Sequence, residues 1–484
     1  MLELNRRSPL TLPDGATAPR YDVRAAKPGI VHIGLGGFHR AHLARYMHDL
    51  MDVDASALNW GIIGSGLRAN DVPLLRALEK QDGLYTLVER DTNGESKTVI
   101  GSIVGVINAS ETTALLLSAI AQPNIRIVSC TVTEAGYHLD PATKTLALKS
   151  PAIAHDIAHP RMPQTLPGIL VEAYRQRRAA GMKAFTALTC DNIQHNGHVL
   201  RTAVLTLAEQ TDADLAAWIA ANARFPSSMV DRITPVPTQA EIEALTTKTG
   251  VVDAASLSAE AFRQWVIEDD FADGRPDWSR VGAQFVPDVA PYEAMKLRLL
   301  NGSHLAIAGA GALAGYETVE QTMNDPAIRR FMQRLMDEET GPLLAPVPGI
   351  DLAQYKATLI ARFANPAIRD TVRRINTDAP INLLLDPLRD ALAAGAPIDL
   401  LALALAAWCK RVCDSVANGE PITGANANAG LQSHAATCAE DPARLLSYEP
   451  TFGDLGSNPR LMAALREWLA TITSDGIAAA LQRI

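Results

Sequence analysis

A short apolar strand, a glycine turn and a helix follow one another in GIVHIGLGGFHRAHLARYMHDLM, residues 29–51. This order opens a dinucleotide-binding unit, in which glycines let the backbone turn tightly and approach a pyrophosphate. Gly34 and Gly36 stand where the turn and the close approach need them, but His39 replaces the third glycine of the usual pattern. The sequence predicts such a unit here, and a plain strand-to-helix turn is the alternative.

An acidic residue that bonds the ribose hydroxyls normally lies about 20 residues beyond the glycines, after the second strand. Asp52 and Asp54 have this spacing but precede the next strand-like run, whereas Asp71 follows it. We therefore expect Asp71, with Asn70 beside it, to contact the ribose, which favours NAD over NADP; Arg68 leaves some tolerance of a 2′-phosphate. The predicted coenzyme-binding residues are Gly34, Gly36, Gly37, Phe38, Asn70 and Asp71.

Strand-like runs alternate with helical patterns along the first half of the chain, at 85–89, 99–107, 125–133 and 183–192. This alternation predicts a mostly parallel sheet. From about residue 290 long helical segments follow, and 484 residues exceed what one core accommodates. We expect an α/β fold with a Rossmann-type N-terminal domain over 1–287, a mostly α-helical C-terminal domain over 288–484, and a ligand cleft between them.

Charge and hydropathy exclude several classes of protein. A net charge of −9 argues against nucleic acid or an anionic membrane as the main partner. No apolar run reaches the ~18 residues of a membrane span, and the N-terminus lacks the apolar core of a signal peptide. A cytoplasmic location is therefore expected, and the five scattered cysteines indicate buried thiols in a reducing compartment.

Three polar side chains, Lys296, Asn301 and His304, interrupt the apolar helical run PYEAMKLRLLNGSHLAIAGAGALAG. Burying polar groups is costly, and apolar surroundings favour the neutral form of a lysine, which can then act as a general base. The alternative is a lysine whose charged end reaches the surface while the amide and imidazole bond nearby backbone. On a regular helix Lys296 and Asn301 would be about 140° apart. Lys296 must then lie on an irregular turn or reach round with its long side chain.

Further polar residues fall at the carboxyl ends of predicted strands, where parallel sheets bind ligands: Thr133, Glu134, Asp191 and Asn192. Glu134 could relay a proton or start a helix. Asn192 could donate to a carbonyl oxygen or cap the next helix. The histidine pairs at i,i+3 spacing are His39 with His42 and His195 with His198. No third ligand lies close in sequence to either pair, so no metal is expected.

Longer motifs extend over nearly the whole chain. They include IVHIGLGGFHRAH, WGIIGSGL, QDGLYTLVER, IRIVSCTVTEAGY, AFTALTCDNIQHNGHV, FPSSMVDRITPV, WVIEDDFADGRP, PYEAMKLRLLNGSHLA and APVPGIDLAQYKATLIARFANPAIRD. Through these motifs the chain closely resembles the polyol-specific long-chain dehydrogenases, the mannitol 2-dehydrogenase and fructuronate reductase family. The resemblance implies a Rossmann-type domain, a helical domain and NAD-dependent, zinc-independent oxidation of a sugar alcohol to a ketose.

The resemblance also assigns catalytic roles to residues of this chain. Lys296 matches the base that takes the alcohol proton, and Asn192 and Asn301 match two asparagines that polarise the reacting oxygen. His304 matches a histidine that orients the polyol. Glu134 matches a glutamate that connects the lysine to solvent.

Substrate binding is where the chain departs from the family. Asp231 and Arg374 match positions that hold substrate hydroxyls, but the sequence after Arg374 reads RRINTDAPINLLLDPL. Relatives carry a loop of the form S-D-G-S-S-K-x-P there, about two residues longer, and its polyol-binding lysine is replaced by Pro380 or its neighbours. Mannitol and fructose are therefore the first expectation, D-arabinitol or sorbitol oxidation is close behind, and fructuronate or another hexuronate is a further candidate for reduction.

Two other classes remain open at this stage. One is a protein that senses NAD(H) without catalysis, and the other is a metal-dependent alcohol dehydrogenase. The expected partner is a small polyol or ketose, with no nucleic acid or membrane, and the expected assembly is a monomer or a weak homodimer.

Overall fold

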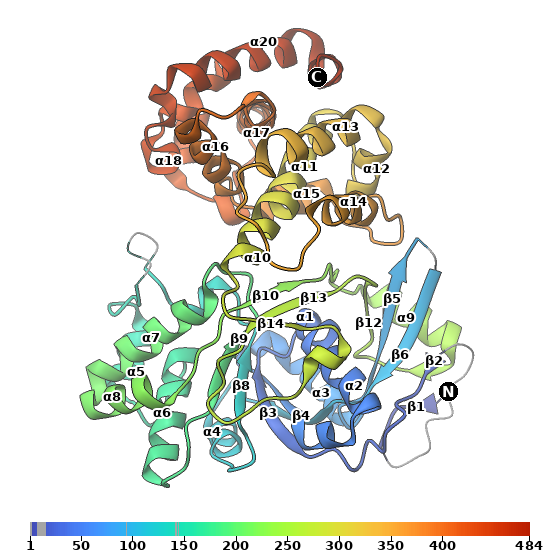
Figure 1. The fold of residues 1–484 in the computed structure, drawn as a ribbon, viewed down its shortest axis with the longest axis vertical. Coiled ribbons are helices and arrows are strands. Elements are labelled where there is room, and N and C mark those ends of the chain that lie inside the picture. The colour runs from blue at the N-terminus through green and yellow to red at the C-terminus, as the bar shows by residue number, and fades with distance from the viewer. Residues whose placement is uncertain (1, 7–15, 93, 141–142, 144) are drawn as a thin grey trace. The chain divides into compact units, whose positions relative to one another are not determined.

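The computed structural model describes residues 2–6, 16–92, 94–140, 143 and 145–484. The chain forms two compact units, Met1–Ala290 and Pro291–Ile484. Sheets and helices alternate in the first unit, and the second is built of helices (Figure 1). The expected α/β class, with a Rossmann-type N-terminal part and a mostly helical C-terminal part, is confirmed.

Five parallel strands form the central sheet of the first unit, in the order β7-β4-β3-β8-β9. Their bounds are β3 (Pro28–Ile33), β4 (Gly61–Gly66), β7 (Ile103–Asn108), β8 (Ile127–Cys130) and β9 (Thr186–Thr189). From β3 the chain builds the sheet first to one side, through β4 and β7, and then to the other, through β8 and β9. Ligands of such sheets bind at the carboxyl ends beside this reversal, and the glycine turn at residues 34–37 follows β3 there.

Apolar clusters cover both faces of this sheet. Val31 and Ile33 belong to one cluster and Ile30 to the other, because successive side chains of a strand point to opposite faces. The helices described in this unit are α1 (Gly37–Ala41), α2 (Leu43–Val53), α3 (Val72–Lys80), α4 (Ala114–Ile120), α5 (Pro151–Ala158), α6 (Leu166–Ala179), α7 (Asn196–Thr211), α8 (Ala213–Asn222) and α9 (Gln239–Thr249). The first cluster includes residues of α6 and α7, and the second includes residues of α2.

Smaller sheets complete the first unit, in the orders β12-β5-β6-β2, β10-β13-β14 and β1-β11. Their strands are β1 (Leu2–Glu3), β2 (Ala16–Thr17), β5 (Tyr85–Asp91), β6 (Gly94–Ile100), β10 (Ser228–Asp231), β11 (Val251–Val252), β12 (Leu257–Glu260), β13 (Gln264–Glu268) and β14 (Gln284–Val286). The run 99–107, expected to be one strand, is divided between β6 and β7, which belong to different sheets. The chain changes sheet at Gly101, where a side chain would collide with Val23 and Tyr21.

The second unit is built around the buried helix α17, on which α11 and α20 pack. Its helices are α10 (Ala290–Met295), α11 (Ser303–Leu313), α12 (Val319–Asn324), α13 (Pro326–Arg334), α14 (Leu352–Phe363), α15 (Val372–Asp378), α16 (Asn382–Ala394), α17 (Asp399–Ala417), α18 (Ala429–Ala435), α19 (Glu449–Phe452) and α20 (Pro459–Gln482). At Gly309 of α11 a Cβ would lie 3.8 Å from Ala407 and Trp408 of α17, an ordinary packing distance.

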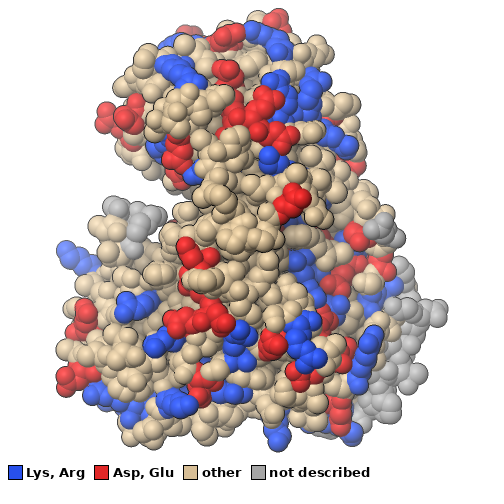
Figure 2. Space-filling model, in the orientation of Figure 1, with Lys and Arg blue, Asp and Glu red and all other residues tan. Residues whose placement is uncertain are grey.

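Acidic and basic side chains are interspersed on the face of the described residues shown in Figure 2. All five cysteines are buried and carry free thiols. In the described part of the chain, no helix has both the length and the apolar character that crossing a membrane requires.

Candidate active site

A π-helical segment, Lys296–Gly302, joins α10 to α11. In a π-helix each N–H bonds the carbonyl five residues earlier, so residues five apart are separated by about one turn. Lys296 and Asn301 therefore lie near one another along the same side of the segment, where an α-helix would set them about 140° apart. Of the two arrangements that the spacing allowed, an irregular turn or a long reach of the lysine side chain, the structure has the irregular turn.

Both ionisable residues of the motif are buried, since Lys296 and His304 each expose 7% of their surface. Met295, Leu299 and Leu300 around the lysine are buried as well. So low an exposure of the whole residue favours a buried lysine over the alternative, a lysine whose charged end reaches open water.

The His304 ring is fixed by neighbours within the second unit. It stacks on Phe363 of α14, with ring centroids 4.3 Å apart. Its Nε2 lies 3.8 Å from Oδ2 of Asp370, a buried residue that comes just before α15. Sequence reasoning missed Asp370, although its position four residues before Arg374 is the spacing at which a helix pairs opposite charges.

Arg374 is held by the same carboxylate. Its Nε donates to Oδ1 of Asp370 at 2.7 Å and its Nη2 donates to Oδ2, and Asp378 lies 3.5 Å from Nη1. About half of the Arg374 side chain is exposed. A guanidinium held at two nitrogens is fixed in direction, so Arg374 presents its remaining N–H groups in a defined orientation.

The loop after Arg374 is held by Asn426. The Asn426 side chain accepts from the N–H of Ile381 at 2.9 Å and donates to the carbonyl of Ala379 at 2.9 Å. Pro380 lies between these two bonds. The amide of Asn426 thus braces the loop at both ends.

Two further predicted site residues, Glu134 and Asn192, follow neighbouring strands of the first unit. The ends of β8 and β9 pair through Cys130 and Thr189. Glu134 begins a 3₁₀ turn a few residues after β8, and Asn192 comes three residues after β9. Parallel pairing brings these chain ends to the same edge of the sheet.

Asp231 ends β10, opposite Gln264 of β13. Its exposure is 4%. A carboxylate so deeply buried is held in place by its surroundings and is suited to recognising a hydroxyl by direction.

The glycine turn after β3 has the features that a dinucleotide requires. Gly34 has φ +98°, and a Cβ there would overlap the carbonyl oxygen of Thr131, so only glycine fits. Gly36 borders open space, because the nearest atom to a Cβ placed there would be the carbonyl oxygen of Gly34, at 3.8 Å. An uncovered backbone at this point can approach a pyrophosphate closely.

His39 stands at the position of the third glycine, and its side chain is buried. Its ring stacks on His32 with centroids 3.4 Å apart, and both of its ring nitrogens are buried with no hydrogen-bond partner among the described residues. Burial lowers the pKa of His39 well below its ordinary value and that of His32 to about 3. Phe38 stacks on His42, with centroids 4.9 Å apart.

Asp71 lies at the carboxyl end of β4, as the sequence predicted, in the 3₁₀ turn Ala69–Asp71. Its Oδ2 accepts from the backbone N–H of Arg68 at 3.0 Å, and Nη2 of Arg68 lies 3.4 Å from Oδ1. The Cβ of Asp71 would be 2.7 Å from a side chain at Gly66, so the glycine keeps the carboxylate close to the strand end. Asn70 beside it is exposed.

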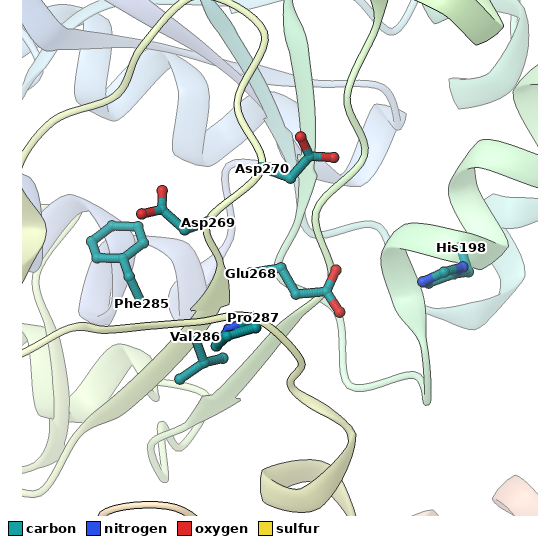
Figure 3. Close-up of a pocket in the computed structure, with 7 residues that line it drawn as sticks. All are labelled: His198, Glu268, Asp269, Asp270, Phe285, Val286 and Pro287. Carbon is teal, nitrogen blue, oxygen red and sulfur yellow. The ribbon is translucent and has the colours of Figure 1, made fainter.

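A separate open pocket of about 570 Å³ lies in the first unit (Figure 3). It is lined by His198, Glu268, Asp269, Asp270, Phe285, Val286 and Pro287. Its acidic side chains already have partners: Asp269 pairs with Arg275, Asp270 with Arg224, and Glu268 accepts from the N–H of Ser227. No predicted site residue lines this pocket.

Within the described residues, no three histidine, cysteine or acidic side chains come together as a group that could hold a metal. Nε2 of His42 instead contacts the backbone carbonyl of Gln264 at 3.0 Å. The rings of His195 and His198 are 6.3 Å apart, edge to face.

Comparisons with known proteins cover both units. The family model for the mannitol dehydrogenase Rossmann domain matches residues 28–280, and the model for the mannitol dehydrogenase C-terminal domain matches residues 288–473. A mannitol 2-dehydrogenase of Cereibacter sphaeroides is 41% identical over 471 residues, 96% of this chain and 98% of that protein. The D-mannonate oxidoreductase of Escherichia coli is 44% identical over 397 residues, 81% of each.

A solved structure extends this similarity to three dimensions. The chain matches the ternary complex of Pseudomonas fluorescens mannitol 2-dehydrogenase with NAD and D-mannitol with a TM-score of 0.87 and 40% sequence identity. The match covers 100% of this chain and 99% of the Pseudomonas fluorescens chain. The chain belongs to the mannitol dehydrogenase family.

Proposed function

We propose that this protein oxidises a secondary hydroxyl of a sugar alcohol to a ketone without zinc, with mannitol to fructose as the first candidate and Lys296 as the general base. By family membership it is an NAD-dependent polyol dehydrogenase. The observation that carries the proposal is the π-helical turn. It aligns a buried lysine with Asn301, and so supplies a proton acceptor and an amide donor for one substrate oxygen.

The coenzyme would be held by the residues after β3 and β4. The open backbone at Gly36 leaves room for a pyrophosphate. The carboxylate of Asp71, at the end of β4, would accept from ribose hydroxyls and repel a 2′-phosphate. NAD, when bound, would accept the hydride of the carbinol carbon.

The side chains then act on the substrate oxygen. Nζ of Lys296 takes the hydroxyl proton, and the amides of Asn192 and Asn301 donate to the oxygen as it becomes a carbonyl. Fixed donors of this kind stabilise charge without having to reorient during the reaction. Glu134 passes the lysine proton to solvent.

Other side chains orient the substrate. His304, fixed between Phe363 and Asp370, directs the polyol. Asp231 and Arg374 would bind hydroxyls away from the reacting carbon, and in this chain Asn426 supports the loop that lacks the family's lysine.

Hexuronate reduction is the second candidate. It is favoured by the 44% identity to a D-mannonate oxidoreductase, and D-arabinitol and sorbitol remain candidates for oxidation. We also propose that the two functional domains meet between residues 287 and 288, that the protein is cytoplasmic, and that it is a monomer or a weak homodimer.

A panel of substrates tests the proposed oxidation of a sugar alcohol. We expect NAD-linked oxidation of mannitol to have the highest kcat/KM among mannitol, D-arabinitol, sorbitol, xylitol and the hexonates that correspond to the hexuronates. Higher kcat/KM for a hexonate would favour the second candidate. Binding of NADH with no turnover on the whole panel would identify a sensor, and loss of activity with a chelator, restored by zinc, would contradict the lysine mechanism.

A further inference from the structure

The backbone next to Glu134 is strained. Thr133 has φ 63° and ψ 169°, a conformation that is essentially restricted to glycine. Of the four non-glycine residues with positive φ in the described part of the chain, three lie around Glu134 and Asn192: Thr133, His138 and His195. Strain of this kind persists only where the surrounding structure enforces it, and it gathers at functional sites.

The side chain that enforces it is Asp191. Oδ1 accepts from the N–H of Thr133 at 2.8 Å, and Oδ2 accepts from the N–H of Val132 at 3.0 Å. The hydroxyl of Tyr137, at the end of the turn that Glu134 begins, donates to Oδ2 at 2.8 Å. One buried carboxylate therefore holds the chain on both sides of Glu134.

The backbone of Asp191 is held in place by Asn196. The side chain of Asn196 donates to the Asp191 carbonyl and to that of Ser228, both at 2.8 Å, and accepts from the N–H of Ser228 at 3.0 Å. This ties the segment that carries Asn192 to β10, the strand that ends at Asp231.

We propose that Asp191 is a positioning residue, whose side chain sets the direction of Glu134 while its backbone carries Asn192. The inference rests on the proposed roles of Glu134 and Asn192. It deepens them, because one carboxylate then couples the group that relays the proton to a group that polarises the oxygen.

An amide at position 191 cannot replace the carboxylate. An ionised carboxylate only accepts hydrogen bonds, and here it meets three donors. In Asp191→Asn the NH₂ group would face at least one of these donors. Thr133 would then relax towards an ordinary conformation and Glu134 would turn away.

Asp156 provides a matched control. It is buried as well, and it accepts from two successive backbone N–H groups, of Gln164 at 2.8 Å and of Thr165 at 3.0 Å, and from the Thr165 hydroxyl at 2.6 Å. Apart from a further contact of its Oδ1 with Nδ1 of His155 at 3.1 Å, it has a similar pattern of bonds, at a place that holds no predicted site residue. Asp156→Asn measures what the loss of such a pattern costs in stability alone.

The experiment compares kcat, KM for the polyol, the NADH dissociation constant and the thermal midpoint. We expect Asp191→Asn to lower kcat by about 10- to 100-fold, since small misplacement of reacting groups can cost this much, with the NADH dissociation constant within about twofold. Asp156→Asn should lose thermal stability to a similar extent while kcat stays within about twofold. Equal kcat losses in the two variants would overturn the proposal, as would wild-type kcat in Asp191→Asn.

A rescue experiment separates positioning from general destabilisation. Glycine adopts the Thr133 conformation without strain, so Asp191→Asn/Thr133→Gly should recover part of the lost kcat, whereas Asp191→Asn/Thr133→Ala should not. If neither double variant recovers activity, or both do, the proposal is wrong. Full activity in Asn192→Ala would instead show that the proposed function itself fails.

Should Asp191→Asn fail to fold, Tyr137→Phe removes one of the three bonds to Asp191, together with the hydrogen bond between the hydroxyls of Tyr137 and Thr189. It should lower kcat several-fold without a change in NADH binding. Unchanged kcat in Tyr137→Phe would then overturn the inference.

Discussion

Oδ2 of Asp370 lies 3.8 Å from Nε2 of His304, and the same carboxylate holds the guanidinium of Arg374. Asp370 thus sets the position of two residues proposed to contact the polyol. Both lie in the second unit, on α11 and α15.

Asp370→Asn should therefore raise KM for the polyol and lower kcat/KM by about tenfold, a loss of roughly 1.4 kcal/mol in transition-state binding. The NADH dissociation constant should not change. Asp378→Asn is the control, because Asp378 lies 3.5 Å from Arg374, whereas Asp370 contacts Arg374 and also lies 3.8 Å from His304. Equal effects of the two substitutions would contradict the role of Asp370.

Coenzyme preference depends on Asp71. Asp71→Ala should raise KM for NAD+ and lower KM for NADP+, since the carboxylate accepts from ribose hydroxyls and repels a phosphate. Asp54→Ala is the control: Asp54 also caps a 3₁₀ turn, but at the opposite end of β4. Steady-state kinetics with both coenzymes distinguish the assignments, and a shift in preference with Asp54→Ala alone would show that the wrong acid was chosen.

The two glycines of the turn should respond differently to alanine. Gly34→Ala should destabilise the fold by several kcal/mol, because the new Cβ meets the Thr131 carbonyl at a positive φ. Gly36→Ala should keep the wild-type thermal midpoint and weaken NADH binding, since its Cβ enters open space. Thermal unfolding and NADH titration of both variants check this, and unimpaired NADH binding by Gly36→Ala would place the pyrophosphate elsewhere.

Stability should fall in mild acid. Burial lowers the pKa of His32, His42 and His48 to about 3 each, whereas in the unfolded chain a histidine titrates near 6.5. Above the unfolded pKa these histidines are neutral in both states, and the folded protein has its full stability. Below it the unfolded chain takes up protons that the folded chain does not, at a cost of about 1.4 kcal/mol per pH unit for each histidine. Urea unfolding between pH 7 and pH 5 measures this slope, and a flat profile would contradict the burial of neutral imidazoles.

The parts of the fold that follow from local chemistry could be predicted from the sequence. The strand, glycine turn and helix after residue 29, the position of Asp71 after the second strand and the change to helices near residue 290 all depend on short patterns. The wide angle that a regular helix would set between Lys296 and Asn301 also indicated an irregular turn, although the spacing alone did not specify a π-helix.

Features that depend on tertiary contacts could not be predicted in this way. The division of 99–107 between two sheets reflects the packing of Tyr21 and Val23 against Gly101, residues that are distant in sequence. The bonds from Asp191 to Val132 and Thr133 join residues nearly 60 positions apart. No local sequence pattern predicts the positive φ that these bonds impose on Thr133.

The central claim is that Lys296 takes the substrate proton, and single-turnover kinetics of Lys296→Ala test it most directly. Lys356→Ala is the control, because Lys356 is also in the second unit but pairs with Asp337 at 2.8 Å. We predict that Lys296→Ala slows hydride transfer by at least about 100-fold, with NADH binding within twofold of wild type and Lys356→Ala unaffected. Hydride transfer at the wild-type rate in Lys296→Ala would contradict the account.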